Sequence, residues 1–367
     1  MNIQLSETQE MLRTSAREFL SENCPVSLVR EMRRDGTGFP PALWEAMTEL
    51  GWLGLSLPED CGGSGMPFLD LCLLQEELGR ACAPTPFIPV ATASLLISEY
   101  GSAAQKNELL PRIATSGLIV VPALQPAHDG KGLEQPLTAE PSAGGWKVSG
   151  RLEFVPWAGA AASMLCPMKL EAGGADTHLA IIPVNTQEIS LTPLHAVGPD
   201  RLWNVELQSV PVTTDAVLAV SDARIVARAH ALMDTARCCD IVGALGFVLE
   251  ATVAYAKDRR QFNRSIGSFQ AIQHYCADMH IMLEGLRIAA YAAAWSLSET
   301  REAGRDVAIL CSYAHRVVPQ ILNLAHQVHG AMGVTQEHDL HLYTTRAIPP
   351  AHDLLPTATY LDAVLTE

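Results

Sequence analysis

Residues 222–258 read DARIVARAHALMDTARCCDIVGALGFVLEATVAYAKD, and apolar residues recur through this stretch with an almost unbroken helical period. The pattern predicts one helix on the order of 50 Å long. Two further helical patterns follow, at about 268–298 and 306–328. Three long helices with short connections pack most simply as an antiparallel bundle. We therefore expect a C-terminal helical bundle domain over residues 223–367.

The part of the chain before residue 116 also has helical character. Ser6 followed by Gln9, and Ser102 followed by Gln105, match the capping-box pattern. In that pattern the side chains of the first turn satisfy backbone N–H groups that have no partner inside the helix. We expect an N-terminal helical domain over residues 1–115.

Residues 116–222 change to short β-rich runs bounded by glycine, proline, asparagine and aspartate. No helix-length pattern interrupts these runs, which favours an antiparallel sheet or barrel over a parallel sheet. Two consecutive glycines, Gly144 and Gly145, indicate a hairpin. The strands expected in this middle β domain are Leu118–Leu124, Trp146–Val148, Leu152–Val155, Leu179–Val184 and Trp203–Leu207.

The composition limits the class of protein. The 367 residues are 48% hydrophobic and carry a formal net charge of −15, which excludes a disordered chain and argues against nucleic-acid binding. No 18-residue apolar run is present, so no membrane partner is expected. The first residues lack the basic and apolar regions of a secretory leader, so we expect a cytoplasmic protein. The nine cysteines are scattered without C-x-x-C spacing, so we expect reduced thiols and no metal site.

Several segments, in a chain whose order is helical, β, helical, point to a known family. They are YAKDRRQF at 255–262, IGSFQ at 266–270 and QVHG at 327–330, with LGWLG at 50–54 and EELGR at 76–80 nearer the N-terminus. Together they resemble the acyl-CoA dehydrogenase family over essentially the whole chain. The resemblance implies an α+β fold of acyl-CoA dehydrogenase type. Such a fold has an N-terminal helical domain, a middle antiparallel β domain and a C-terminal domain of four-helix-bundle type.

The resemblance also implies a reaction and a cofactor. Members of the family use FAD to remove two hydrogens from an acyl-CoA thioester, which leaves an α,β double bond. A carboxylate takes the α-proton while the β-hydrogen leaves as hydride to the flavin. The enzymes assemble as dimers or tetramers with each FAD between two subunits. An electron-transferring flavoprotein is the acceptor that the family implies.

The family's FAD contacts fall on a defined set of positions. Arg259 corresponds to an arginine that reaches the diphosphate of a neighbouring subunit's FAD, and a planar guanidinium suits bidentate bonds to phosphate. Without the resemblance, Arg259 is interpreted as a surface charge that compensates a helix dipole, and Gly330 as a helix C-cap. The expected cofactor-binding residues are Arg259, Gln261, Phe262, Phe269, Gln270, Gln327, Gly330 and Ala331, the last replacing a usual second glycine.

The positions that face the chain's own flavin ring depart from the family. The Thr-Glu-Pro step that hydrogen-bonds the ring reads LQP at 124–126, and the aromatic–Ile–Thr element behind the ring reads FVP at 154–156. Leu124 cannot donate a hydrogen bond, and Pro156 has neither a hydroxyl nor an N–H. We expect that contacts to a neighbour's FAD persist while those to the chain's own ring are eroded.

The family's catalytic glutamate is missing from both of its usual places. The C-terminal motif reads IPPAHDLL at 348–355, and the helix position falls at Met233. Asp240 lies on the same helical stripe and is the candidate catalytic residue, because an acid among apolar side chains can have a raised pKa and act as a base. The alternative is a structural acid paired with an arginine, which the roughly 10 Å offset from Met233 favours. Asp234 and Arg237 are expected to form a surface i,i+3 pair.

These departures lead to the hypothesis of a subunit of a hetero-oligomeric, FAD-dependent acyl-CoA dehydrogenase. A paralogous partner would carry the glutamate in an α2β2 assembly, as in two-subunit enzymes that shorten steroid or other bulky side chains. One alternative is a self-sufficient homo-oligomer with Asp240 as base. Another is a flavin-binding relative that is no dehydrogenase, either an enzyme of thioester elimination or a regulatory pseudoenzyme.

Overall fold

The N-terminal part of the molecule is helical, as the capping patterns indicate. The computed structural model describes residues 4–124, 137–170, 177–219, 224–300 and 304–354, without the side chains of 350–353. Both predicted capping boxes are confirmed, because Ser6 and Ser102 each accept a hydrogen bond from the third residue of their helix. The helices are α1 (Glu7–Asn23), α2 (Val26–Met32), α3 (Pro41–Glu49), α4 (Phe68–Arg80), α5 (Phe87–Tyr100) and α6 (Ala103–Ser116).

A seven-stranded sheet follows, with the path β1-β4-β2-β3-β7-β6 and β5 paired to β4. Most neighbours are antiparallel, and Gly144–Gly145 lie at the turn of the predicted hairpin between β2 and β3. Strand β4 differs, since it pairs parallel with both β1 and β2. The strands are β1 (Val120–Pro122), β2 (Thr138–Ser142), β3 (Gly145–Pro156), β4 (Ser163–Leu170), β5 (Thr177–Pro183), β6 (Ile189–Leu194) and β7 (Leu202–Thr213).

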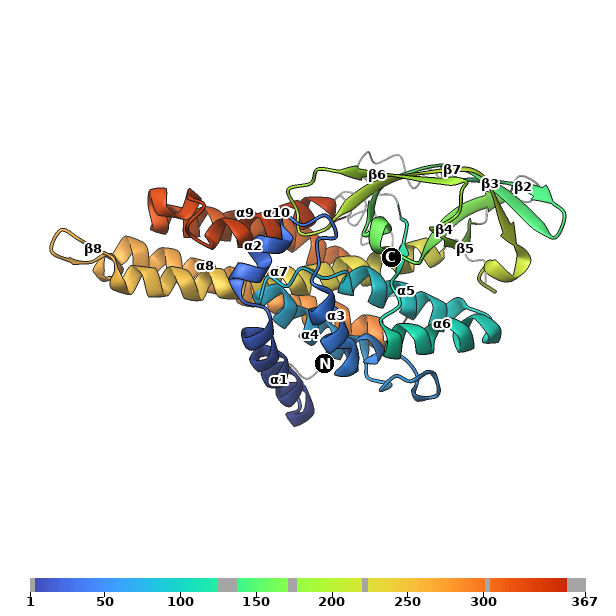
Figure 1. Ribbon diagram of the computed structural model, residues 1–367. Coiled ribbons are helices and arrows are strands. Elements are labelled where there is room, and N and C mark those ends of the chain that lie inside the picture. The colour runs from blue at the N-terminus through green and yellow to red at the C-terminus, as the bar shows by residue number, and fades with distance from the viewer. Residues whose placement is uncertain (1–3, 125–136, 171–176, 220–223, 301–303, 355–367) are drawn as a thin grey trace.

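The C-terminal part is a bundle built around the predicted long helix. Figure 1 shows this helix, α7, running beneath the sheet and out to the far end of the bundle, where a small hairpin of β8 and β9 projects. The predicted three-helix pattern is confirmed, and a fourth helix packs beside it. The elements are α7 (Arg224–Asp258), β8 (Arg260–Gln261), β9 (Arg264–Ser265), α8 (Gln270–Glu299), α9 (Gly304–His329) and α10 (Leu340–Asp353).

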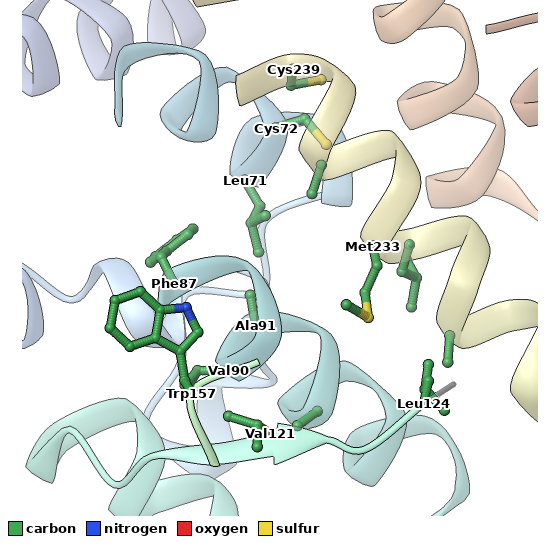
Figure 2. Packing of buried hydrophobic residues seen from close by; sticks show 14 of the residues in the cluster. Leu71, Cys72, Phe87, Val90, Ala91, Val121, Leu124, Trp157, Met233 and Cys239 are labelled. Carbon is green, nitrogen blue, oxygen red and sulfur yellow. The ribbon is translucent and has the colours of Figure 1, made fainter. Parts of the chain in front are cut away.

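Helix α7 is the core helix that joins all parts of the molecule. It holds an 18-residue window apolar enough to cross a membrane, but 61% of that window is buried in the molecule. Its Gly243 packs directly on α4, where an added Cβ atom would lie 1.8 Å from the carbonyl oxygen of Glu76. Figure 2 shows the continuation of this core, with Met233 of α7 pointing toward Leu124 at the end of β1. Small residues on this face of α7 therefore serve close helix packing.

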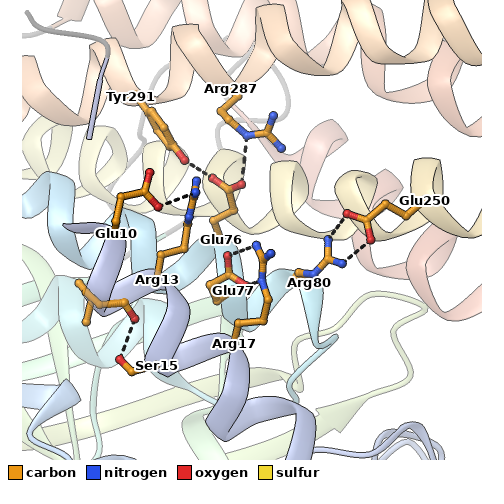
Figure 3. Close-up of polar contacts among 11 residues, drawn as sticks. Glu10, Arg13, Ser15, Arg17, Glu76, Glu77, Arg80, Glu250, Arg287 and Tyr291 are labelled. Carbon is orange, nitrogen blue, oxygen red and sulfur yellow. Dashed lines mark hydrogen bonds and ion pairs between the residues drawn. The ribbon is translucent and has the colours of Figure 1, made fainter. Parts of the chain in front are cut away.

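Helix α4 is also held by buried charges. Figure 3 shows that its Glu76 accepts hydrogen bonds from the Tyr291 hydroxyl at 2.6 Å and from Arg287 at 3.1 Å, both on α8. The neighbouring Glu77 accepts two bonds from Arg17 of α1. Burial beside Glu76 raises the pKa of the Tyr291 hydroxyl, so that it remains a donor. The EELGR segment is therefore structural: it fixes α1, α4 and α8 around α7.

Candidate functional site

The predicted diphosphate-binding arginine lies where α7 ends. Arg259 follows the last helical residue, and its backbone N–H donates to the Tyr255 carbonyl while its own carbonyl accepts from Ile266. The hairpin beyond it turns at Phe262 and Asn263, with φ angles of 54° and 60°. Two successive left-handed residues are what a tight hairpin turn requires. Arg259 thus lies between the end of α7 and the base of a short hairpin.

The second predicted cofactor element lies at the same end of the bundle. Gly330, with φ of 59°, ends α9, as a helix C-cap glycine does. The preceding residue, His329, stacks on Tyr255 of α7 with ring centroids 4.5 Å apart. The hairpin and the end of α9 therefore form one surface, at the end of the bundle farthest from the sheet (Figure 1).

This bundle-end surface presents nearly all the expected cofactor-binding residues to solvent. Phe262 is 85% exposed. Phe269 is partly buried, and the guanidinium carbon of Arg264 lies over its ring, 3.9 Å from the ring centroid. Large exposed apolar side chains mark interaction surfaces. The remaining exposed members of the expected set are Arg259, Gln261, Gln270, Gln327, Gly330 and Ala331.

A pocket of about 250 Å³ lies between the sheet and α7, on the other side of the molecule. The positions expected to face a flavin ring line it: Leu124 after β1, and Phe154 and Pro156 at the end of β3. Gln125 and Pro126 lie outside the described residues. Met233, the position of the family's helix glutamate, is a buried part of the same wall. The pocket wall therefore has a methionine where the family has its helix glutamate. It has a leucine and a proline where the family has hydrogen-bond donors to the flavin ring.

The two regions differ in how they fit FAD. The side chains of Leu124 and Pro156 supply no hydrogen bond to a flavin ring, so this wall of the pocket does not match the polar edge of the ring. The exposed guanidinium of Arg259 and the amides of Gln261 and Gln327 match a diphosphate and an adenine that approach from outside the chain. The bundle-end residues therefore suit the phosphate and adenine parts of a dinucleotide, whereas the pocket wall does not suit a flavin ring.

The pocket is also lined by three polar side chains: His230, Arg237 and Asp200. Their place in this pocket was not predicted from the sequence. His230 and Arg237 are three residues before and four residues after Met233, so helical periodicity places them on the same face. Asp200 comes from the β6–β7 connection and carries no sequence signal. It accepts a hydrogen bond from the Trp157 indole at 3.0 Å.

The electrostatics of these groups are set by burial. Burial, together with the nearby charge of Arg237, lowers the pKa of His230 to about 4. The Arg237 guanidinium lies 3.8 Å from carboxylate oxygens of both Asp200 and Asp234. The predicted Asp234–Arg237 contact exists, but its placement on the surface was wrong, since the Asp234 side chain is only 1% exposed. The elements packed against α7 bury this side chain.

Asp240, the candidate catalytic residue, lies in a buried ion pair. Its two oxygens accept hydrogen bonds from Arg346 of α10 at 2.8 and 2.7 Å, and Gln75 of α4 donates a third at 2.6 Å. Arg346 also donates to the Ala83 carbonyl. A carboxyl group engaged in this way ties three helices together. The geometry favours the structural interpretation of Asp240.

Comparisons with known proteins cover most of the chain. Residues 6–117 match the model of the acyl-CoA dehydrogenase N-terminal domain, and residues 226–348 match that of the C-terminal domain. Acyl-CoA dehydrogenase FadE34 of Mycobacterium tuberculosis is 30% identical over 93% of this chain, which spans only 45% of that longer relative. Acyl-CoA dehydrogenase IpdE2 of Mycolicibacterium smegmatis is 26% identical over 96% of both chains.

Solved structures share the whole architecture. A variant of the Tcur3481–Tcur3483 steroid ACAD superposes with a TM-score of 0.87 and 25% identity, covering 98% of this chain and 97% of the other. The ChsE4–ChsE5 complex from Mycobacterium tuberculosis superposes with a TM-score of 0.91 and 24% identity, covering 100% and 98%. The second of these similarities shows the fold alone.

Proposed function

Because the chain belongs to the acyl-CoA dehydrogenase family, whose cofactor is FAD, we propose that it is one subunit of a hetero-oligomeric acyl-CoA dehydrogenase. In this proposal a paralogous partner holds the flavin ring and the catalytic glutamate. This chain binds the outer half of the partner's FAD through Arg259, Gln261 and Gln327. The bound FAD supplies the hydride acceptor for α,β-dehydrogenation of an acyl-CoA thioester.

The observation that carries the proposal is the separation of the two half-sites. Met233, in the pocket wall, and Tyr255, in the bundle-end surface, are 22 residues apart on one continuous helix, which corresponds to roughly 33 Å. One dinucleotide does not extend from one half-site to the other. In this proposal the bundle-end surface acts on a cofactor whose flavin ring lies in another chain, because the side chains of Leu124, Pro156 and Met233 offer a flavin ring no hydrogen bond in this chain's own pocket.

Exposed apolar side chains on the bundle support an oligomer. Ile281, Ile288 and Trp295 on α8, and Ile309 on α9, are exposed large hydrophobic residues of one helical layer. Such faces are expected to be covered by another subunit. The similarity to the Tcur3481–Tcur3483 steroid ACAD, whose name joins two proteins, supports a paralogous partner over a homo-oligomer, and the proposal takes the assembly to be α2β2. The steroid ACAD similarity supports a bulky acyl group, and an electron-transferring flavoprotein completes the proposal as electron acceptor.

The proposal predicts that the chain purified alone binds FAD poorly and has no turnover. The reason is that its pocket lacks both the side-chain hydrogen bonds to the flavin ring and a glutamate at the family's helix position, where Met233 stands. FAD content is read from the flavin absorbance of the purified protein, and turnover from bleaching of that absorbance on adding acyl-CoA. Co-expression with a paralogue is expected to restore both FAD binding and turnover. Stoichiometric FAD with full bleaching in the lone chain would contradict the subunit proposal, and FAD without bleaching in the pair would favour a pseudoenzyme.

A further inference from the structure

We propose that the turn Gly330–Val334, which follows α9 in the bundle-end surface, is a pH-sensitive element. The turn is closed while three neighbouring histidines, His326, His329 and His338, are neutral, and it opens when these rings take up protons. This behaviour belongs to the lone chain. It requires neither a partner subunit nor FAD, and so goes beyond the proposed function.

The first support is the close packing of the turn on the histidine rings. His329 is the last residue of α9, and its ring centroid lies 4.8 Å from that of His338. His326 lies one helical turn earlier. A Cβ atom added to Gly333 would lie 3.0 Å from the Cβ of His329 and 3.1 Å from the Nδ1 atom of His326. The turn therefore closes directly over both α9 histidines.

The second support is that hydrogen bonds fix both α9 histidines in a neutral form. The Nδ1 atom of His329 lies 2.8 Å from the Ala325 carbonyl oxygen, which only accepts, so Nδ1 carries the proton. The Nε2 atom of His326 lies 2.8 Å from the Thr344 hydroxyl oxygen. That hydroxyl donates its one hydrogen to the Leu340 carbonyl, so Nε2 of His326 must donate to it.

The other nitrogen of each ring has no place for a second proton. Nε2 of His329 and Nδ1 of His326 are buried and have no hydrogen-bond partner among the described residues. Nδ1 of His338 accepts a hydrogen bond from the backbone N–H of Leu340 at 3.1 Å. Protonation would thus bury an N–H group without an acceptor at two rings and set it against a donor at the third, which is unfavourable while the turn is closed. Opening exposes these atoms to water.

The surrounding charges do not compensate a proton on these rings. Burial is the main cause that lowers the pKa of His326 and of His329, and the charge of His338 lowers both further, while the hydrogen bond to Ala325 acts in the opposite direction at His329. Among the described residues, no carboxylate raises the pKa of either ring, and Asp339 pairs with Arg30 instead. The titratable and charged residues that the neighbouring elements carry here are Tyr255, Lys257, Asp258 and Arg259 at the end of α7, His274, Tyr275 and Asp278 of α8, Arg30 of α2, Glu337, His338 and Asp339 before α10, and His341, Tyr343 and Arg346 of α10.

The direction of the pH dependence follows from these lowered pKa values. In the open turn the rings regain the ordinary pKa of histidine, near 6.5. The open form therefore binds more protons than the closed form, and opening becomes more favourable as the pH falls below about 6.5. Gly330 and Ala331 lie in this turn, so contacts that they make to a partner's FAD would weaken at the same pH.

The test is hydrogen–deuterium exchange of the full-length lone chain at pH 7 and pH 5, followed by mass spectrometry and corrected for the intrinsic effect of pH on exchange. Each group that gains a proton makes opening up to about tenfold more favourable per pH unit. We expect the protection of amides 326–340 to fall at least tenfold between the two pH values. Helix α6 is the internal control, because it contains no histidine and lies far from this surface (Figure 1).

His329→Phe keeps a ring to stack on Tyr255 but removes one titrating group. It is expected to reduce the loss of protection at pH 5 at least threefold. His274→Phe is the matched control, because His274 is an exposed histidine on α8 and its replacement is expected to leave the pH dependence unchanged.

The outcomes separate this inference from the proposed function. Protection of 326–340 that falls no more than that of α6 in the unaltered chain overturns the pH-sensitive turn, even if the His329 variant does not fold. An equal pH dependence in the His329→Phe and His274→Phe variants overturns the role of the histidine cluster. Neither result depends on FAD or on a partner, whereas FAD content and turnover of the assembled enzyme test the subunit proposal on their own.

Discussion

Replacing Asp240 with asparagine is expected to lower the free energy of unfolding by about 3–5 kcal/mol, the usual cost of breaking one side of a buried ion pair. The substitution leaves the Arg346 guanidinium buried without its counter-ion, since both carboxylate oxygens of Asp240 bond to it. The asparagine amide also places an N–H group opposite an N–H donor of Arg346 or Gln75, so that one of these hydrogen bonds is lost. Urea unfolding followed by circular dichroism measures the loss.

Two further variants make the Asp240 result specific. Glu10→Gln breaks the exposed Glu10–Arg13 pair and is expected to cost less than about 1 kcal/mol. The double change Asp240→Leu with Arg346→Met removes both charges together and is expected to recover much of the loss, because apolar side chains of similar volume often replace buried ion pairs. A stable Asp240→Asn protein whose assembled enzyme has lost turnover would instead make Asp240 the catalytic base.

The second large effect is expected for Arg259→Ala in the assembled enzyme. Removing two charged hydrogen bonds to a diphosphate, each contributing about 1.5–3 kcal/mol, is expected to weaken FAD binding at least a hundredfold. The stability of this chain should be unchanged, because Arg259 is exposed and is held here only through its backbone. Fluorescence titration of the apo-enzyme with FAD gives the affinity.

Arg260→Ala is the matched control for Arg259. Arg260 is the next residue, carries the same charge and is equally exposed on strand β8. General electrostatic attraction for FAD would be reduced by both changes to a similar extent, whereas a specific diphosphate contact is lost only with Arg259. Equal FAD affinity in the two variants would contradict the role of Arg259 and favour its interpretation as a surface charge at the end of α7.

The helices could be predicted because their signals are local. Periodicity placed α7 and α8 to within about two residues, and the capping boxes at Ser6 and Ser102 are present as expected. Strand β4 was missed, because its sequence SMLCPMKL is buried on both faces and contains Pro167, so it shows no alternation. Its parallel pairing with β1 and β2 depends on contacts distant in sequence, which no local pattern contains.

The candidate site was predictable only where it depends on position along a helix. The placement of Met233 on the pocket wall and the exposure of Arg259 agree with expectation. The burial of Asp234 was not predicted, because it depends on how distant elements pack against α7, which no local pattern contains. The Asp240–Arg346 pair joins helices more than 100 positions apart, so sequence reasoning could propose an arginine partner but not identify it. Asp200 enters the pocket from a connection that has no motif.

The central claim is that this chain contributes to FAD binding without holding a flavin of its own. Native mass spectrometry of the chain co-expressed with its paralogue tests it most directly, because the measurement counts polypeptides and cofactors in one assembly. We predict a hetero-oligomer with equal numbers of the two chains and half as many FAD molecules as chains. A homo-oligomer of this chain carrying one FAD in every subunit would contradict the account.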